Sequence, residues 1–164
     1  MIETPFFKAV ALLALLGGCA EMTGGMRGGP AGAPASDRPA PPEEIAAIVA
    51  APPPPAAART ADQFDTVTDE QRQAARAGPS ATEARLGETV ASLGDPTESG
   101  LWMKTPLVDT QRPGRIEYPA TGESAVVELR PLEATGGGSQ VSLAAMRLLG
   151  APLTDLPTLV VYAE

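Results

Sequence analysis

The chain has 164 residues, 17 of them Gly and 18 Pro, with only 4% aromatic side chains, so it suffices for one small domain with a thin core. Its formal net charge of −8, from 20 acidic and 12 basic residues, excludes nucleic-acid binding, because an acidic surface repels phosphate backbones. The absence of His and the single Cys exclude Ser-His-Asp and Cys-His catalysis, His-based zinc sites and an internal disulfide, and we expect no cofactor and no metal.

The N-terminal residues 1–18 have the layout of an export signal. Lys8 precedes an apolar stretch, Ala9–Leu16, which is shorter than the roughly 20 residues that cross a bilayer and matches the apolar core of such a signal. The segment ends on Leu16, Gly17 and Gly18, followed by Cys19, a pattern that resembles the lipobox of bacterial lipoproteins. This resemblance implies that the Cys19 thiol receives a diacylglyceryl group, that residues 1–18 are removed, and that the new amine is acylated.

The residue that follows Cys19 bears on where the chain is held. It is Ala20 and not Asp, which by the same resemblance implies delivery to the outer membrane of double-membraned bacteria. Two or more acyl chains anchor a protein stably, whereas one does not. We therefore predict a chain held in the lipid bilayer by acylated Cys19, at the periplasmic face of the cell outer membrane. The alternative interpretation is an ordinary buried Cys after a short apolar helix.

Residues 19–59 are rich in Gly, Ala and Pro, with runs such as GGMRGGPAGAP and APPPPAAA. Such runs bury too little apolar surface to offset the entropy of the chain, and Pro favours an extended polyproline II backbone. We predict a disordered linker that holds the rest of the chain away from the membrane. Within it, Glu43–Val49 is slightly apolar, and we interpret it as linker, with a short helical turn as the alternative.

Residues 60–78 are predicted to form a helical neck. Thr68 and Gln71 form a capping box, in which the Thr hydroxyl accepts from an early backbone N–H and the Gln side chain reaches back. Gly78, followed by Pro79, ends the helix. The exposed side is polar throughout, which favours a spacer or a cover over the edge of a domain.

The residue pattern over 86–164 is typical of a small β-rich domain. Short apolar or β-branched runs, separated by turns rich in Gly and Pro, predict strands at 89–93, 101–105, 114–118, 124–129 and 159–162. Ser142 is the N-cap candidate of a short helix over 143–149, which Gly150 ends. The predicted fold class is mainly β with short helices: a small β-barrel, or an α+β domain, preceded by a disordered linker and a short helix.

The order of elements after residue 114 resembles the later half of a double-psi β-barrel, as in the rare lipoprotein A-like domains of bacterial envelopes. The match covers roughly a third of the chain. It consists of a hairpin turn, a Val-rich strand, a helix start, a helix end and a closing strand: Ala120-Thr121-Gly122, Val126-Val127, Ser142-Leu143-Ala144-Ala145, Leu149-Gly150 and Val160-Val161-Tyr162. The resemblance implies a small, partial double-psi-like barrel, with peptidoglycan or an envelope protein as its partner.

Active members of that family carry an acidic proton donor in a loop just after the Val-rich strand. At that place this chain has Arg130-Pro131-Leu132-Glu133, so Glu133 is the candidate catalytic acid, displaced from the family's position, and the family's His is missing. A second carboxylate would come from Asp95, Glu98, Asp109 or Glu128. Trp102 is the candidate ligand contact, as a ring on which a sugar stacks, and a core or rim aromatic is the alternative.

Three functions follow, ranked from the one that these residues support best to the one that they support least. The first is a non-catalytic binding or structural module at the peptidoglycan or the outer membrane. The alternative is an enzyme similar to the peptidoglycan lytic transglycosylases, with Glu133 as its acid. A further alternative, a sugar-acid dehydratase of the D-galactarate dehydratase kind, is not supported, because the chain has no His and no thiolate cluster to hold iron.

Overall fold

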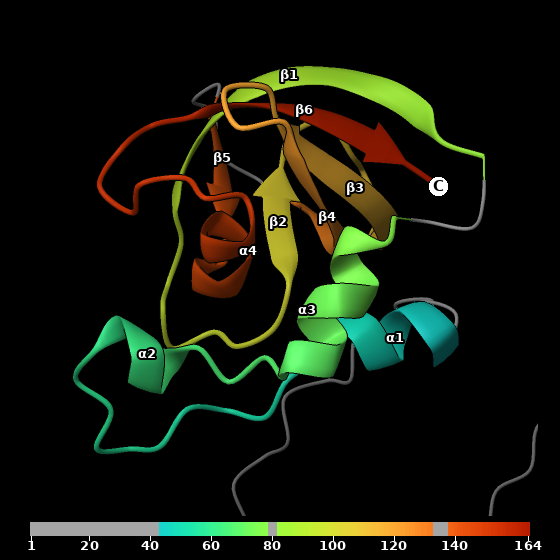
Figure 1. Ribbon diagram of the computed structural model, residues 1–164. Helices are drawn as coiled ribbons and strands as arrows, with labels where there is room; N and C mark the ends of the chain where they lie inside the picture. The colour runs from blue at the N-terminus through green and yellow to red at the C-terminus, as the bar shows by residue number, and fades with distance from the viewer. Residues whose placement is uncertain (1–42, 79–81, 133–137) are drawn as a thin grey trace, which may run out of the picture. The chain divides into compact units, whose positions relative to one another are not determined.

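Six strands close into a barrel in the part of the chain that the structure describes (Figure 1). This computed structural model describes residues 43–78, 82–132 and 138–164; Cys19, the signal segment 1–18 and Glu133 lie outside them. The strands are β1 (Ala84–Leu93), β2 (Trp102–Thr105), β3 (Arg112–Tyr118), β4 (Glu123–Pro131), β5 (Gly138–Val141) and β6 (Thr158–Ala163). Around the barrel they follow the order β1-β5-β2-β4-β3-β6. The prediction of a mainly β fold with a small barrel and short helices is confirmed.

Two of the strand pairs in this barrel are parallel. β1 lies parallel to β5 and β2 lies parallel to β4, whereas the pairs β1–β6, β2–β5, β3–β4 and β3–β6 are antiparallel. Parallel neighbours need a crossover connection, so the strands interlock and do not form a simple meander. The β3–β4 hairpin turns where the sequence predicts it, and Gly122 in that turn has a φ of 75°, which glycine adopts at little cost.

The barrel strands and helix α4 (Leu143–Leu148) share one apolar core. Met103, Ile116 and Leu129 are fully buried, and most of α4 is buried with them. The hydroxyl of Ser142 accepts from the backbone N–H of Ala145 at 3.3 Å, so the predicted N-cap and the short helix that follows it are confirmed.

The predicted helical neck over 60–78 is two helices, α2 (Ala61–Phe64) and α3 (Asp69–Arg76). The capping box of Thr68 with Gln71 is present as predicted, and Thr60 forms a second one with Gln63. Two helix-start signals so close together favour two short helices over one continuous helix. Within the described ranges, no helix combines the length and the apolar character that crossing a bilayer requires.

Helix α1 (Glu43–Val49) falls inside the range 19–59, for which we predicted a disordered linker. Ile45 and Val49 lie four residues apart, on one face of the helix, and both are buried in the core. From Glu43 onward the chain is therefore part of the folded unit, because α1 supplies an apolar face that packs against the rest of it.

Hydrogen bonds hold the backbone that leads out of α1. The N–H of Leu101 donates to the carbonyl oxygen of Val49 at 2.8 Å, and the Ser99 hydroxyl donates to that of Ala51 at 2.9 Å. Gly100 lies between these two donors with a φ of 92°, and a Cβ there would overlap the Val49 carbonyl oxygen. Residues 49–51 therefore run against the loop before β2, where they form the wall of the site described next.

Candidate functional site

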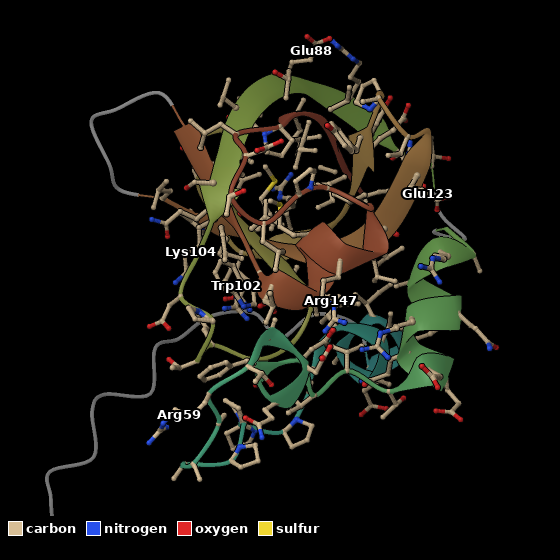
Figure 2. All side chains as sticks on the ribbon, turned by 60° about the vertical axis from the view of Figure 1, so that its left-hand side comes forward. Arg59, Glu88, Trp102, Lys104, Glu123 and Arg147 are labelled. Atoms are coloured by element: carbon tan, nitrogen blue, oxygen red, sulfur yellow. The ribbon has the colours of Figure 1, made fainter. Side chains whose placement is uncertain are left out.

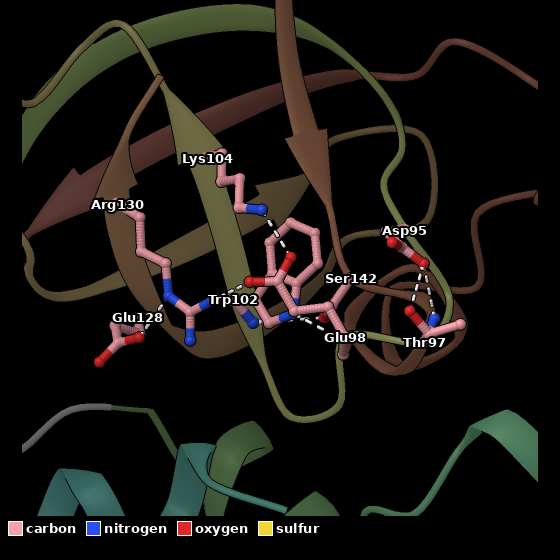
Figure 3. Close-up of polar contacts among 8 residues, drawn as sticks. All are labelled: Asp95, Thr97, Glu98, Trp102, Lys104, Glu128, Arg130 and Ser142. Atoms are coloured by element: carbon pink, nitrogen blue, oxygen red, sulfur yellow. Dashed lines mark hydrogen bonds and ion pairs between the residues drawn. The ribbon is translucent and has the colours of Figure 1, made fainter. Parts of the chain in front are cut away.

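A cluster of charged side chains surrounds Trp102 on the face of β2 and β4 that is turned away from the core (Figure 3). In the parallel register, Trp102 lies beside Glu128 and Lys104 lies beside Arg130. Alternate residues of a strand point to opposite faces, so these four share one face, and the intervening Met103 and Leu129 belong to the core. We call these four residues, together with Glu98 from the preceding loop, the Trp102 cluster.

Ion pairs run through the Trp102 cluster from one end to the other. Glu98 accepts from Lys104 Nζ at 2.5 Å through Oε2, and from Arg130 Nη1 at 2.6 Å through Oε1. Arg130 Nε then donates to Glu128 Oε2 at 2.5 Å. Two carboxylates thus share two cations, with Arg130 between them. The oxygens in these pairs all accept hydrogen bonds from cations, so none of them is arranged to donate a proton to a glycosidic oxygen.

The indole ring of Trp102 is the floor of this cluster and is fully buried. Its Nε1–H donates to the Glu98 carbonyl oxygen at 3.0 Å, and a Cβ at Gly94 would overlap its six-membered ring. Lys104 Nζ lies 4.7 Å from the ring centroid and the Arg130 guanidinium carbon lies 5.6 Å from it, both within cation–π range. In this arrangement the cations cover Trp102, so a ligand would meet Lys104 and Arg130 before it reached the ring. The predicted role of Trp102 in ligand contact stays a prediction.

A pocket of about 220 Å³ lies between this cluster and the α1 segment. We call it the α1 pocket. Glu128 and Arg130 line one side, and the other side is formed by the segment from Ala46 to Ala51 together with Ser99. The Glu128 side chain is only 8% exposed, and its second oxygen, Oε1, accepts from Gln111 Nε2 at 2.5 Å. The pocket thus combines a fixed carboxylate and guanidinium with small apolar side chains and backbone, a mixture that suits hydroxyl- and amide-bearing ligands.

The structure brings together two of the four carboxylates named from the sequence. Glu98 and Glu128 meet through Arg130, whereas Asp109 is exposed and takes no part in the cluster. Asp95 lies nearby, but its carboxylate accepts from the hydroxyl and the backbone N–H of Thr97, and these two hydrogen bonds lower its pKa. Glu133 and the lipobox residues Leu16, Gly17, Gly18 and Cys19 lie outside the described residues.

A second polar pocket, of about 210 Å³, was not found by sequence reasoning. It is lined by Asp65, Arg72, Arg76, Arg147 and Leu148, and we call it the arginine pocket. Its arginines come from α3 and α4, which are far apart in the chain, so no local spacing indicates that they meet. The Trp102 cluster left a partial signal: Glu128 lies on the predicted strand 124–129, and Arg130, two residues on, shares its face because the strand continues to Pro131.

Within the ranges that the structure describes, no group of three or more Cys, Asp or Glu side chains is placed to hold a metal ion. No protein-family model matches the chain, and no curated protein or solved structure is significantly similar to it.

Proposed function

We propose that this chain is a cell-envelope lipoprotein, anchored through acylated Cys19 at the periplasmic face of the outer membrane, and that its barrel is a non-catalytic binding module for peptidoglycan. The barrel is proposed to be of the double-psi type. Its support is the closed ring of six strands with two parallel pairs, together with the order of turn, Val-rich strand and capped helix.

The observation that carries the binding proposal is the pairing of Glu128 with Arg130 at the wall of the α1 pocket. A catalytic acid needs a proton to give, which requires a carboxyl group kept neutral by its surroundings. Glu128 instead accepts from Arg130 and Gln111, and Glu98 accepts from Lys104 and Arg130. Side chains held this firmly suit recognition, because their geometry is set before a ligand arrives.

Glycan and peptide groups fit the chemistry of the α1 pocket. N-acetylated sugars and short peptides present hydroxyl, amide and carboxylate groups, which match a guanidinium, a carboxylate and the Ser99 hydroxyl. The lipid anchor would keep the barrel close to the cell wall and raise the local concentration of this insoluble partner. Binding at the wall and anchoring in the membrane would then make the chain a link between the two layers.

The anchor is tested by metabolic labelling of the full chain with palmitate, in native form and as Cys19→Ser. We expect label in the native chain and none in the variant, which would accumulate with residues 1–18 still attached. Label that still enters Cys19→Ser would contradict the anchor, as would a native chain with its starting Met and an unmodified thiol in mass spectrometry.

The binding module is tested by co-sedimentation of the full chain with purified peptidoglycan. Glu128→Gln keeps the shape of the side chain and removes the charge that holds Arg130, so we expect binding about fivefold weaker, the equivalent of roughly 1 kcal/mol. Glu123→Gln, at the exposed start of β4, is the matched control and should bind as the native chain does (Figure 2). Equal binding by both variants would contradict the site. Clearing of a peptidoglycan gel by the native chain that Glu133→Gln abolishes would contradict the non-catalytic assignment.

A further inference from the structure

Helix α1 lies beside α3 and is not part of the ring of strands (Figure 1). The six strands pair with one another all the way round, so the barrel closes without any contribution from α1. With seven residues, α1 is shorter than the roughly 12 that an isolated helix needs to be even marginally stable in water. The helical form of α1 therefore depends on its contacts, whereas the strand pairing of the barrel does not depend on α1.

The contacts that hold α1 are two buried side chains and a set of accepted carbonyl oxygens. Ile45 and Val49 are its buried residues. The last turn of a helix leaves carbonyl oxygens without a partner inside the helix. Here the side chain of Gln71, from α3, supplies partners: its Nε2 donates to the carbonyl oxygen of Ala47 at 2.8 Å and to that of Ala50 at 2.5 Å.

The backbone that follows α1 is held in the same way. Besides the two bonds from the loop before β2, the Thr66 hydroxyl donates to the carbonyl oxygen of Pro52 at 2.6 Å. Every one of these donors lies outside the segment that it holds, so residues 43–52 can leave as one unit while water replaces the donors. We call residues 43–52 the latch. We call the four donors the α1 socket: Thr66 Oγ1, Gln71 Nε2, Ser99 Oγ and the Leu101 N–H.

We propose that the latch leaves its socket and returns while the barrel stays folded, and that only its docked form completes the α1 pocket. The lining residues from Ala46 to Ala51 belong to the latch, whereas Ser99, Glu128 and Arg130 face them from the other side. A ligand seated between the two walls contacts both, so its binding holds the latch closed, and opening the latch releases it. This inference rests on the proposed function, because the ligand is the peptidoglycan of that proposal.

Two glycines provide a variant that opens the latch and its matched control. Gly100 has a φ of 92°, and a Cβ there would lie 2.4 Å from the carbonyl oxygen of Val49. Gly122 has a φ of 75°, and its Cβ would meet nothing within 4 Å. Gly100→Ala and Gly122→Ala thus carry the same left-handed backbone strain, and only the first also pushes against the latch.

Gln71→Glu opens the latch by a second route that leaves every glycine in place. Gln71 Oε1 accepts from the backbone N–H of Thr68 in the capping box of α3, and a Glu side chain keeps this acceptor. The Nε2 that donates to Ala47 and Ala50 is replaced by an oxygen, which cannot donate. The variant therefore removes two donors of the socket and preserves the start of α3.

The latch is tested by hydrogen exchange of the full chain, without ligand, followed by mass spectrometry. In the native chain we expect residues 43–52 to exchange faster than the barrel strands, because they open without unfolding the barrel. Relative to the barrel strands, Gln71→Glu should speed exchange of the latch about tenfold, and Gly100→Ala should remove its protection. Gly122→Ala should leave that ratio unchanged. Exchange of the latch only together with the barrel strands would overturn the proposal, as would equal ratios in Gly100→Ala and Gly122→Ala.

A second arm tests the coupling to the ligand. In co-sedimentation with purified peptidoglycan, Gly100→Ala should bind about tenfold more weakly than Gly122→Ala, the effect expected when about a tenth of the molecules are closed. Peptidoglycan solubilised with lysozyme should slow exchange of the latch in the native chain. Native binding without this slowing, or with equal affinity in the two glycine variants, would overturn the coupling. A native chain that does not bind peptidoglycan would contradict the proposed function, whereas exchange without ligand decides by itself whether the latch opens.

Discussion

In the Trp102 cluster two cations meet two carboxylates, whereas three cations and one carboxylate line the arginine pocket. Both sites are built from carboxylates and from arginine or lysine side chains. In the cluster each carboxylate oxygen that faces a cation has a hydrogen bond, so charge and donors are both consumed within the protein. In the pocket, the terminal nitrogens of Arg72 and of Arg147 likewise meet carboxylates, those of Asp65, Asp69 and Asp62. In each network one carboxylate holds two cations, and the two differ in burial: the Glu98 side chain is 33% exposed, whereas that of Asp65 is 1% exposed.

The largest effect is expected when Asp65, the buried carboxylate that lines the arginine pocket, is removed. Asp65→Ala leaves Arg72 and Arg147 close together without the charge that holds them, and removing one partner of a buried pair is costly. Because both arginines are partly exposed, we expect a loss of about 2 kcal/mol in the free energy of unfolding. Urea denaturation followed by circular dichroism measures it.

The matched control for that substitution is Asp62→Ala, which removes an 81% exposed carboxylate from the same arginine, Arg147. Exposed pairs contribute little, so its cost should be about 0.5 kcal/mol or less. Equal costs for the two substitutions would mean that the buried position of Asp65 does not organise the pocket.

A smaller effect is expected from breaking the chain of ion pairs in the Trp102 cluster at its centre. Arg130→Met preserves much of the side-chain length but leaves the nearly buried Glu128 with Gln111 as its remaining partner, so the free energy of unfolding should fall by about 1 kcal/mol. Lys104→Met removes the cation at the end of the chain, where it bonds Glu98 alone, and should cost about half as much. If Lys104→Met proves as costly as Arg130→Met in urea denaturation, Arg130 is not the residue on which the cluster depends.

The smallest effect concerns Asp95, the carboxylate beside the Trp102 cluster that neutral donors hold instead of an ion pair. Hydrogen bonds from Thr97 lower its pKa below the ordinary 3.8 in the folded chain, so its contribution to stability is present above that pH and is lost as the pH falls through the lowered value. Asp95→Asn keeps an acceptor oxygen and does not titrate. Between about pH 5 and about pH 3, its stability should therefore fall slightly less steeply than that of the native chain. Identical slopes in urea denaturation at the two pH values would contradict this account.

Local signals in the sequence predicted the local structure well. Thr68 with Gln71, and Ser142 before its helix, start helices where predicted, because a capping side chain bonds a backbone N–H only two or three residues away. Thr60 with Gln63 forms a second capping box, which starts a separate helix where the sequence analysis predicts a single one.

What the sequence by itself determined is this set of caps, turns and strand faces, because each depends on residues within about one turn or one hairpin of each other. Only the tertiary structure decided the order of strands around the barrel, the docking of Ile45 and Val49, and the meeting of Arg72 with Arg147. These contacts join segments that are far apart in the chain, and many pairings satisfy the same local pattern equally well. Closure of the barrel selects one order of strands, because it pairs every strand on both sides.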